Sequence, residues 1–421
     1  MSIQRKSLRL LPALVAAVCA SSAGAAGFAL LEQNASGIGN AYAGTAASAE
    51  DASTIYFNPA GMAFLPAGNM HFAGSIDLVR PSSKFHDEGS APPTGYPARG
   101  GEGGDIGGWN VVPAAFFALR VNDKISLGLG LGAPFGLKTE YDSDWKGRFQ
   151  ATKSEIKTIN LNPSISFRPN ERMAFGLGIN YQKFDADLRN QARIGPAIET
   201  AVKVEGDDSS WGYNLGAMYQ VSNAMRVGVS YRSAIKYRLE GRVSADAPIP
   251  VLNTGVHADV KVPDSFTLSV AQKLNDKWEM LGDLQWTGWS SLQELAIYRS
   301  DGTLLTREVL EWRDTFRIAL GGNYRYNDAW KLRFGLAYDQ SPVGDSHRLP
   351  RLPDNDRFWI SGGAQWKPAG MAGVVDIGIA YLFMRTPTIN NNQGNLVGKG
   401  LLRGDYDSNV LILGAQYSQS F

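Results

Sequence analysis

The chain has 421 residues, a formal net charge of +1 and 19% charged residues. A balance so close to neutral gives no overall field that would attract nucleic acid, so we expect no nucleic-acid partner. The single cysteine, Cys19, lies near the start of the chain. A disulfide framework is therefore excluded for everything that follows it.

The first 25 residues resemble a secretory signal peptide. Its positive charges come from Arg5, Lys6 and Arg9. They precede an apolar stretch at 10–20 that is too short to span a bilayer comfortably, and small residues at 23–25 fit a cleavage site. We predict a signal peptide at 1–25 and a mature chain that begins at Ala26. A retained membrane anchor is the alternative.

Short turn signals divide the rest of the chain. They are Asn122-Asp123, Asn170-Glu171, Ser222-Asn223, Asn275-Asp276, Asn327-Asp328 and Pro368-Ala369-Gly370. Most intervals between them are about 50 residues long, and each holds two alternating runs and one longer polar loop. A period of this length also occurs in propellers and solenoids. Short turns that alternate with long loops are, however, typical of outer-membrane β-barrels.

The alternating runs have the period of β-strands. In the run 330–338, Trp330, Phe334 and Tyr338 fall on one face, and Lys331 and Arg333 fall on the other. Aromatic residues near the ends of such runs favour a membrane girdle over a soluble sandwich. No segment after the predicted signal peptide has 18 consecutive apolar residues. A closed barrel is therefore the remaining way to cross a membrane.

The number of strands follows from the turns. Twelve strands flank the six turns, and one more at each end, at about 69–79 and about 402–421, makes fourteen. We predict an all-β fold, a transmembrane antiparallel β-barrel of about 14 strands at 67–421, with both ends on the periplasmic side. The predicted outer loops are at about 80–108, 136–147, 189–206, 243–256, 300–307, 344–354 and 387–401.

The segment 26–66 differs from the barrel. It is rich in small residues and has no strand period, and its run Gly37–Gly44 lacks the third glycine of a dinucleotide-binding fingerprint. It also carries apolar side chains, such as Phe28, Tyr42 and Phe57, that need a surface to pack against. We predict that 26–66 forms an N-terminal plug, or hatch, in the lumen of the barrel.

Several motifs resemble the FadL-type outer-membrane transporters of long-chain fatty acids and other hydrophobic compounds (OMPP1/FadL/TodX), and their order covers essentially the whole mature chain. They are Ala26-Gly27-Phe28, Asn58-Pro59-Ala60, Ala133–Tyr141, Phe316–Gly321, Asp339–Pro342 and Pro353–Trp359. The resemblance implies a fourteen-stranded barrel with an N-terminal hatch. It also implies that outer loops capture a hydrophobic ligand, which then reaches a second site beside the hatch.

The resemblance also implies a lateral gate, at a kink in the third strand around Gly130–Gly136. Proline cannot donate to a strand ladder, so Pro134 agrees with an interruption there. The alternative is that Gly132 and Pro134 simply end the strand at a loop. The predicted gate and hatch residues are Asn58, Pro59, Ala60, Gly132 and Pro134. Two features depart from the family: the loop at 189–206 is short, and Gln419 is polar near the C-terminus.

A carboxylate ligand would favour an arginine, whose planar fork binds it with two hydrogen bonds. In the run 310–320 we expect Trp312 and Phe316 to face lipid, while Arg313 and Arg317 face the lumen. The predicted ligand-binding residues are Phe28, Arg148, Arg313, Arg317 and Arg357. The alternative for each arginine is a structural pair with a lumen carboxylate, as we also expect for Asp51.

The resemblance implies passive uptake of hydrophobic small molecules, most simply long-chain fatty acids, across the bacterial outer membrane. The expected partners are that ligand and the membrane lipids, and we expect a monomer. The four histidines show no metal-ligand spacing, so we expect no metal, no cofactor and no enzyme activity. The alternatives are uptake of aromatic or alkane hydrocarbons by the same fold, a general porin, or an outer-membrane hydrolase.

Overall fold

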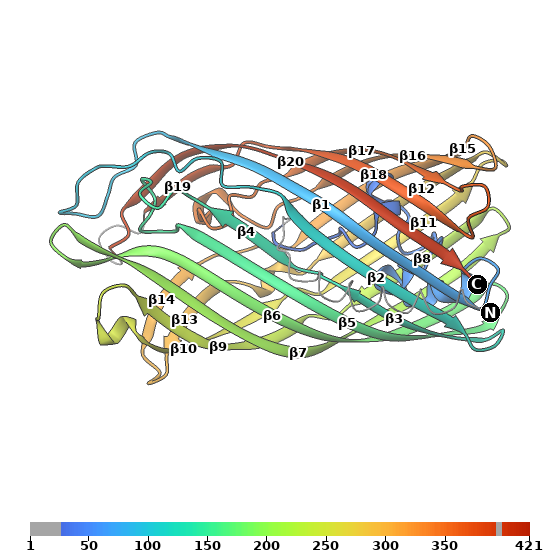
Figure 1. Cartoon of the computed structure of the whole chain (residues 1–421), viewed down its shortest axis with the longest axis horizontal. Helices are drawn as coiled ribbons and strands as arrows, with labels where there is room; N and C mark the ends of the chain where they lie inside the picture. The colour runs from blue at the N-terminus through green and yellow to red at the C-terminus, as the bar shows by residue number, and fades with distance from the viewer. Residues whose placement is uncertain (1–26, 393–397) are drawn as a thin grey trace.

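The computed structural model describes residues 27–392 and 398–421, so the predicted signal peptide lies outside the described residues. Its strands form one antiparallel sheet that closes on itself (Figure 1). The strands are β1 (Met70–Asp87), β2 (Asn110–Arg120), β3 (Ile125–Gly132), β4 (Gly136–Glu140), β5 (Lys153–Asn170), β6 (Met173–Gly195), β7 (Ile198–Ser222), β8 (Met225–Arg232), β9 (Ile235–Ala245), β10 (Thr254–Val262), β11 (Ser265–Lys273), β12 (Trp278–Thr287), β13 (Glu294–Arg299), β14 (Leu304–Val309), β15 (Thr315–Arg325), β16 (Trp330–Asp339), β17 (Arg357–Trp366), β18 (Gly373–Met384), β19 (Thr388–Asn392) and β20 (Leu401–Ser420).

The helices are short. They are α2 (Ala35–Ile38), α3 (Thr54–Phe57) and the 3-10 turns η2 (Pro59–Phe64), η3 (Pro250–Leu252), η4 (Trp289–Ser291) and η5 (Asp345–His347). Within 27–392 and 398–421, no helix is long and apolar enough to cross a membrane.

The twenty labelled strands form fourteen positions around the barrel wall, here called staves. Six staves are interrupted, so each of these carries two strand labels. The interrupted staves are β3/β4, β8/β9, β10/β11, β12/β13, β14/β15 and β18/β19. Each stave pairs with its neighbours in chain order, and β20 closes the barrel against β1 from the pair His71–Ser420 to the pair Asp87–Gly404. The predicted fourteen-stranded barrel is thus confirmed.

All six predicted turns join neighbouring staves at one end of the barrel. Four of them are built alike: the side chains of Asn122, Asn170, Asn275 and Asn327 each accept hydrogen bonds from the backbone N–H groups two and three residues later. An asparagine that bonds to its own backbone in this way stabilises a tight turn, which is why the turns could be found from sequence.

The two faces of the wall differ as the alternation predicts. Along β16, Phe334, Leu336 and Tyr338 are exposed on the outer face, whereas Arg333 and Ala337 are buried. Aromatic pairs mark the edges of this outer apolar belt. Examples are Trp278 with Tyr324, Trp330 with Trp366 and, nearer the outer loops, Tyr181 with Trp211. An apolar belt between aromatic girdles is the outer surface of a membrane barrel.

The prediction of a loop at 189–206 is wrong. β6 and β7 remain paired through this region, from Arg189–Lys203 to Gly195–Ile198, and turn only at 196–197. Outward residues of this extension, such as Asp187 and Lys203, form surface ion pairs. Beyond the membrane both faces of a strand can be polar, so the alternation that marks a spanning strand is lost.

Residues 28–66, the inner segment, lie inside the barrel, as the blue segment in Figure 1 shows. Ala35 donates its backbone N–H to Gln416 of β20, while Asn40 donates its side chain to the carbonyl of Gly322 in β15. The wall is glycine-rich where it meets this segment. A Cβ atom on Gly335 would lie 2.1 Å from the carbonyl carbon of Asn40. Wall glycines therefore leave the room that the inner segment needs.

Candidate functional site

The wall is interrupted at the predicted kink. β3 pairs with β5 up to Gly132–Asn160, and β4 resumes pairing with the same strand at Gly136–Lys157. Across the break the third stave thus has one residue more than its partner, as in a β-bulge. The alternative, that Gly132 and Pro134 end the strand at a loop, is wrong.

The inner segment forms backbone hydrogen bonds with the kinked stave where strand pairing is interrupted. Leu30 donates its N–H to the carbonyl of Pro134 at 2.7 Å, and Gly136 donates to the carbonyl of Phe28 at 2.8 Å. The Gln33 amide donates to the carbonyl of Ala133 at 2.9 Å, and its oxygen accepts from the Ala133 N–H at 3.2 Å. The segment therefore holds the kink from inside.

A seam runs along the other side of the kink. β2 pairs with β3 only as far as Ala115–Leu131, although β2 itself begins at Asn110. Among the described residues, no strand pairing joins the start of β2 to β4. The backbone bonds that close the rest of the wall are therefore missing at this position.

Four aromatic side chains, the aromatic cluster, meet at the N-terminal segment. The Phe28 ring lies 5.7 Å from Phe135 of the kink, 5.0 Å from Trp289 and 5.9 Å from Trp312, centroid to centroid. Trp289 comes from η4, between β12 and β13, and Trp312 from the break between β14 and β15. The cluster therefore links the kink to breaks in the far wall.

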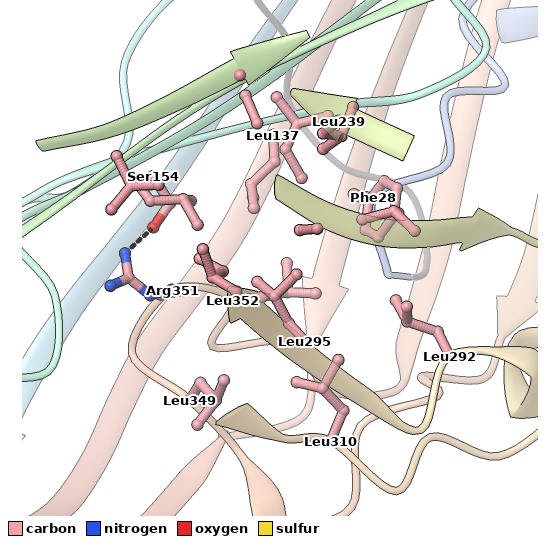
Figure 2. Close-up of a pocket in the computed structure, with 18 of the residues that line it drawn as sticks. Phe28, Leu137, Ser154, Leu239, Leu292, Leu295, Leu310, Leu349, Arg351 and Leu352 are labelled. Carbon is pink, nitrogen blue, oxygen red and sulfur yellow. Dashed lines mark hydrogen bonds between the residues drawn. The ribbon is translucent and has the colours of Figure 1, made fainter. Parts of the chain in front are cut away.

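An apolar cavity, the outer cavity, lies on the outer-loop side of this cluster (Figure 2). It has an empty volume of about 1020 Å³, including its solvent-open part. Its walls are mostly aliphatic, and several leucines in Figure 2 surround it: Leu137, Leu239, Leu292, Leu295, Leu310, Leu349 and Leu352. Phe28 and Trp312 lie at its cluster end. An apolar cavity of this size with few polar groups suits a hydrophobic small molecule.

One edge of the outer cavity is cationic. Arg351, in the loop between β16 and β17, donates from Nη1 to Ser154 Oγ at 3.1 Å and to the carbonyl of Lys153 at 3.2 Å. Its Nε lies 3.9 Å from a carboxylate oxygen of Glu308, which Lys399 contacts at 2.6 Å. Burial lowers the pKa of the Arg351 guanidinium, but arginine stays charged in proteins. Two cations thus share one carboxylate at the cavity edge.

Two predicted ligand-binding arginines lie elsewhere. Arg148, in the loop after β4, is buried and donates two hydrogen bonds to the Glu199 carboxylate, from Nε at 2.7 Å and from Nη2 at 3.2 Å. Arg357 is also buried and donates to Asp354 at 2.6 Å. Neither lines the outer cavity. Both arginines thus form the pairs with carboxylates that the structural alternative predicts, and a ligand contact outside the outer cavity stays a prediction for them.

The predicted orientation of Trp312 and Arg313 is wrong. Trp312 is buried against the outer cavity, whereas the Arg313 side chain is 64% exposed and reaches toward Asp356 at 3.8 Å. The chain leaves the strand between β14 and β15, and Glu311 there has a φ of 46°. This irregular stretch shifts the alternation of side-chain directions. Arg313 therefore does not point to the same side as Arg317, although the two are four residues apart.

Arg317 does face the lumen. It donates to the carbonyl of Ala41, and its guanidinium lies 5.1 Å from the ring of Trp359. It therefore contacts the inner segment rather than the outer cavity, and a ligand role for it stays a prediction.

The predicted hatch residues tie the inner segment to the wall. Asn58 is fully buried, caps η2 by accepting from the N–H of Ala60, and donates to the carbonyls of Ala46, Ala217 and Val229. Pro59 and Ala60 are buried in the first turn of η2. Asp51 is not paired with an arginine in the described structure; it accepts from Ser36 and Gln416.

The buried Glu32 should make the opening of the inner segment depend on pH. Burial raises the pKa of Glu32 to about 7, although Arg357 and Arg317 act in the opposite direction. Because the pKa is higher in the folded state than the ordinary value of 4.5, protonation of Glu32 stabilises the folded state. This contribution is complete below pH 4.5 and is lost as the pH rises through about 7. We expect amides of 28–40 to open roughly ten- to a hundredfold more often at pH 8 than at pH 5.

Hydrogen exchange, corrected for intrinsic rates, measures this opening. Glu32→Gln should give protection at both pH values, because the amide has no charge to bury. If the variant keeps the pH dependence of the unmodified protein, another group is responsible.

Sequence reasoning missed Arg351 and Trp289. Arg351 lies in a predicted outer loop, where the strand period assigns no direction to a side chain. Trp289 follows Gly288 at a point where the alternation of β12 stops, and that stop was its only signal. In the described part of the chain, no three acidic, histidine or cysteine side chains gather as a metal site.

The sequence of the whole chain matches one family. A model of the outer membrane protein transport proteins (OMPP1/FadL/TodX) matches residues 16–421. The chain belongs to this family. Its members are outer-membrane transporters of hydrophobic compounds, so the predicted location in the outer membrane is confirmed along with the family.

Individual FadL/TodX proteins are similar to this chain over most of their length. Outer membrane protein P1 of Haemophilus influenzae is 32% identical, over 87% of each chain. The long-chain fatty acid transport protein of Escherichia coli K12 is 28% identical, over 92% of this chain and 94% of that one.

Solved structures in the family share the fold. A Pseudomonas aeruginosa FadL homologue superimposes with a TM-score of 0.88 at 25% identity, covering 94% of this chain and all of that one. The Ralstonia pickettii toluene transporter TbuX gives a TM-score of 0.67 at 18% identity, over 92% and 99% of the two chains, which speaks for the fold alone.

Proposed function

We propose that this protein takes up long-chain fatty acids passively across the outer membrane. The observation that carries the proposal is the outer cavity, whose long aliphatic walls end at Arg351. An acyl chain would fill the apolar part, and its carboxylate would reach the arginine edge beside Ser154. The relatives named as long-chain fatty acid transport proteins support this choice of ligand.

The path would have three steps. The outer loops capture the ligand, and the outer cavity holds it above the aromatic cluster. The inner segment, as a hatch, would block the direct route to the periplasm, since Asn58 binds it to the wall at Ala217 and Val229. The ligand would then leave sideways through the seam beside Gly132 and Pro134, into the membrane.

No step of this path makes or breaks a covalent bond, so we propose that the protein is a transporter and not an enzyme. Uptake of aromatic or alkane hydrocarbons is the second candidate. It is favoured by the outer cavity itself, which is lined almost wholly by apolar side chains. The two candidates differ in one respect: only a fatty acid needs the cation of Arg351.

Binding of a matched acid and alcohol to Arg351→Gln tests the proposal. A charge-assisted hydrogen bond contributes roughly 1.5–3 kcal/mol, so the affinity for hexadecanoic acid should fall about ten- to a hundredfold. The affinity for hexadecanol should change little. Trp312 lines the cavity, and its ring lies 5.1 Å from that of Trp289, so tryptophan fluorescence would report binding.

Arg148→Gln is the matched control, because Arg148 is another buried arginine of the outer loops but lies outside the cavity. It should leave both affinities unchanged. Equal losses of acid and alcohol in Arg351→Gln would favour the hydrocarbon candidate and a structural role for Arg351.

A further inference from the structure

Two lysines face each other on the outside of the barrel, near the outer-loop end of β9 and β10 (Figure 1). Lys236 of β9 and Lys261 of β10 are direct partners in the strand register. Both point away from the lumen, because the adjacent residues Tyr237 and Val260 are buried and Val260 lines the outer cavity. Like charges directly opposite each other on one face of a sheet repel and destabilise the pairing. This lysine pair therefore needs a compensating anion.

The other lysines on the outer face of the neighbouring strands have such an anion. Four lysines of β5, β6 and β7 each form an ion pair with a carboxylate: Lys153 and Lys157 with Glu155, Lys183 with Asp185, and Lys203 with Glu205. In the described part of the chain, neither Lys236 nor Lys261 forms an ion pair. Asp259 lies on the same face of β10 as Lys261, but its partner in the register is Arg238. The protein thus leaves the charge of the lysine pair uncompensated.

The lysine pair lies at the edge of the outer apolar belt. Five residues before Lys236 along the stave β8/β9, the ring of Tyr231 lies 6.1 Å from that of Tyr213, centroid to centroid. Five residues after Lys261 along the stave β10/β11, Phe266 is exposed on the belt. Aromatic side chains at such an edge lie at the level of the lipid head groups. The two ammonium groups are therefore within reach of a head group whose chains pack on the belt.

We propose that Lys236 and Lys261 bind the phosphate of an acylated lipid in the outer leaflet. Two adjacent cations without a protein anion fit a phosphate monoester, because it carries a charge of about −1.5 to −2 at neutral pH. The bound phosphate offsets the repulsion between the lysines, and the acyl chains pack on the belt beside Phe266. This inference does not depend on the compound that the protein transports. It assigns a lipid-binding site to the outer face of β9 and β10.

Binding of lipid A, a glycolipid that carries phosphate monoesters, tests the site. The purified protein in a neutral detergent is titrated with lipid A, and native mass spectrometry counts the bound lipid. A lysine beside an anionic head group contributes about fivefold in affinity, so Lys236→Gln/Lys261→Gln should weaken binding about thirtyfold. Lys261→Arg keeps the charge and should bind as the unmodified protein does. Lipid A from which the phosphates have been removed should bind the unmodified protein about thirtyfold more weakly than lipid A itself.

Two further variants separate the lysine pair from barrel stability and from the overall charge of the rim. Lys236→Glu places a carboxylate opposite Lys261, so the barrel should stay as heat-resistant as the unmodified protein but lose at least as much affinity as the double variant. Lys157→Gln is the matched control. It removes an outward lysine of β5, while Glu155 keeps its contact with Lys153. The affinity for lipid A should change by less than about twofold.

Three results would overturn the proposed lipid site. One is unchanged binding of lipid A in Lys236→Gln/Lys261→Gln. Another is an equal loss in Lys157→Gln, which would mean that the rim attracts the lipid by its overall charge. The third is displacement of lipid A by an equal concentration of inorganic phosphate, which would make the lysine pair a site for free phosphate.

Discussion

A barrel without residues 26–60 is expected to conduct small ions and polar solutes, whereas the intact protein is expected to conduct few. The inner segment bonds to opposite walls, through Ala35 at β20 and Asn58 at β7 and β8, and the wall glycines let it approach closely. Without it, a fourteen-stranded lumen lined by polar side chains would fill with water, as in a porin. Single-channel conductance in planar bilayers should rise by at least about an order of magnitude.

A gentler variant controls for damage to the barrel. Asn58→Ala removes the bonds from the inner segment to the carbonyls of Ala217 and Val229 but deletes no chain. It should give brief openings of intermediate conductance. Folding of both variants can be followed by the strand content in circular dichroism. A deletion variant that folds normally and stays as closed as the intact protein would refute the hatch.

Closing the seam beside the kink is expected to abolish nearly all uptake. A Cβ atom on Gly132 would lie 3.8 Å from the Cβ of Ala114, which is the usual separation across a disulfide. The double variant Ala114→Cys/Gly132→Cys should therefore join the start of β2 to the end of β3. A locked seam would leave the ligand no lateral exit, while binding in the outer cavity remains.

Reduction provides the first control, because the same molecule should regain uptake when the disulfide is broken. This comparison matters, since a Cβ on Gly132 also comes within 2.2 Å of the Gln33 amide oxygen and would displace it in both redox states. Ala319→Cys/Ala337→Cys is the second control, a register pair between β15 and β16 on the far wall. It should leave uptake unchanged. Equal uptake by the oxidised and reduced seam variants would exclude lateral exit at this position.

The barrel could be predicted because its signals are local. The period of two places Phe334 and Leu336 on one face and Arg333 on the other, whatever the rest of the chain does. The asparagines of the short turns bond to their own backbone, so Asn122 or Asn327 marks a turn without help from distant residues. The six predicted turns, four of them of this kind, gave the number of staves once one strand was added at each end. The kink around Pro134 was expected from the family resemblance, and the missing N–H of proline agrees with it.

The binding surfaces were decided only by the tertiary structure. A break between β14 and β15 reverses the expected directions of Trp312 and Arg313, and periodicity cannot carry an orientation across such a break. Arg351 reaches the outer cavity from a loop, and the carboxylate partner of Arg148 is Glu199, which lies far away in sequence. The sequence by itself determined that the chain crosses the membrane as a barrel. Which arginines remain available to a ligand is determined by the packing of loops and inner segment in the lumen, because charge compensation is a contact between distant parts of the chain.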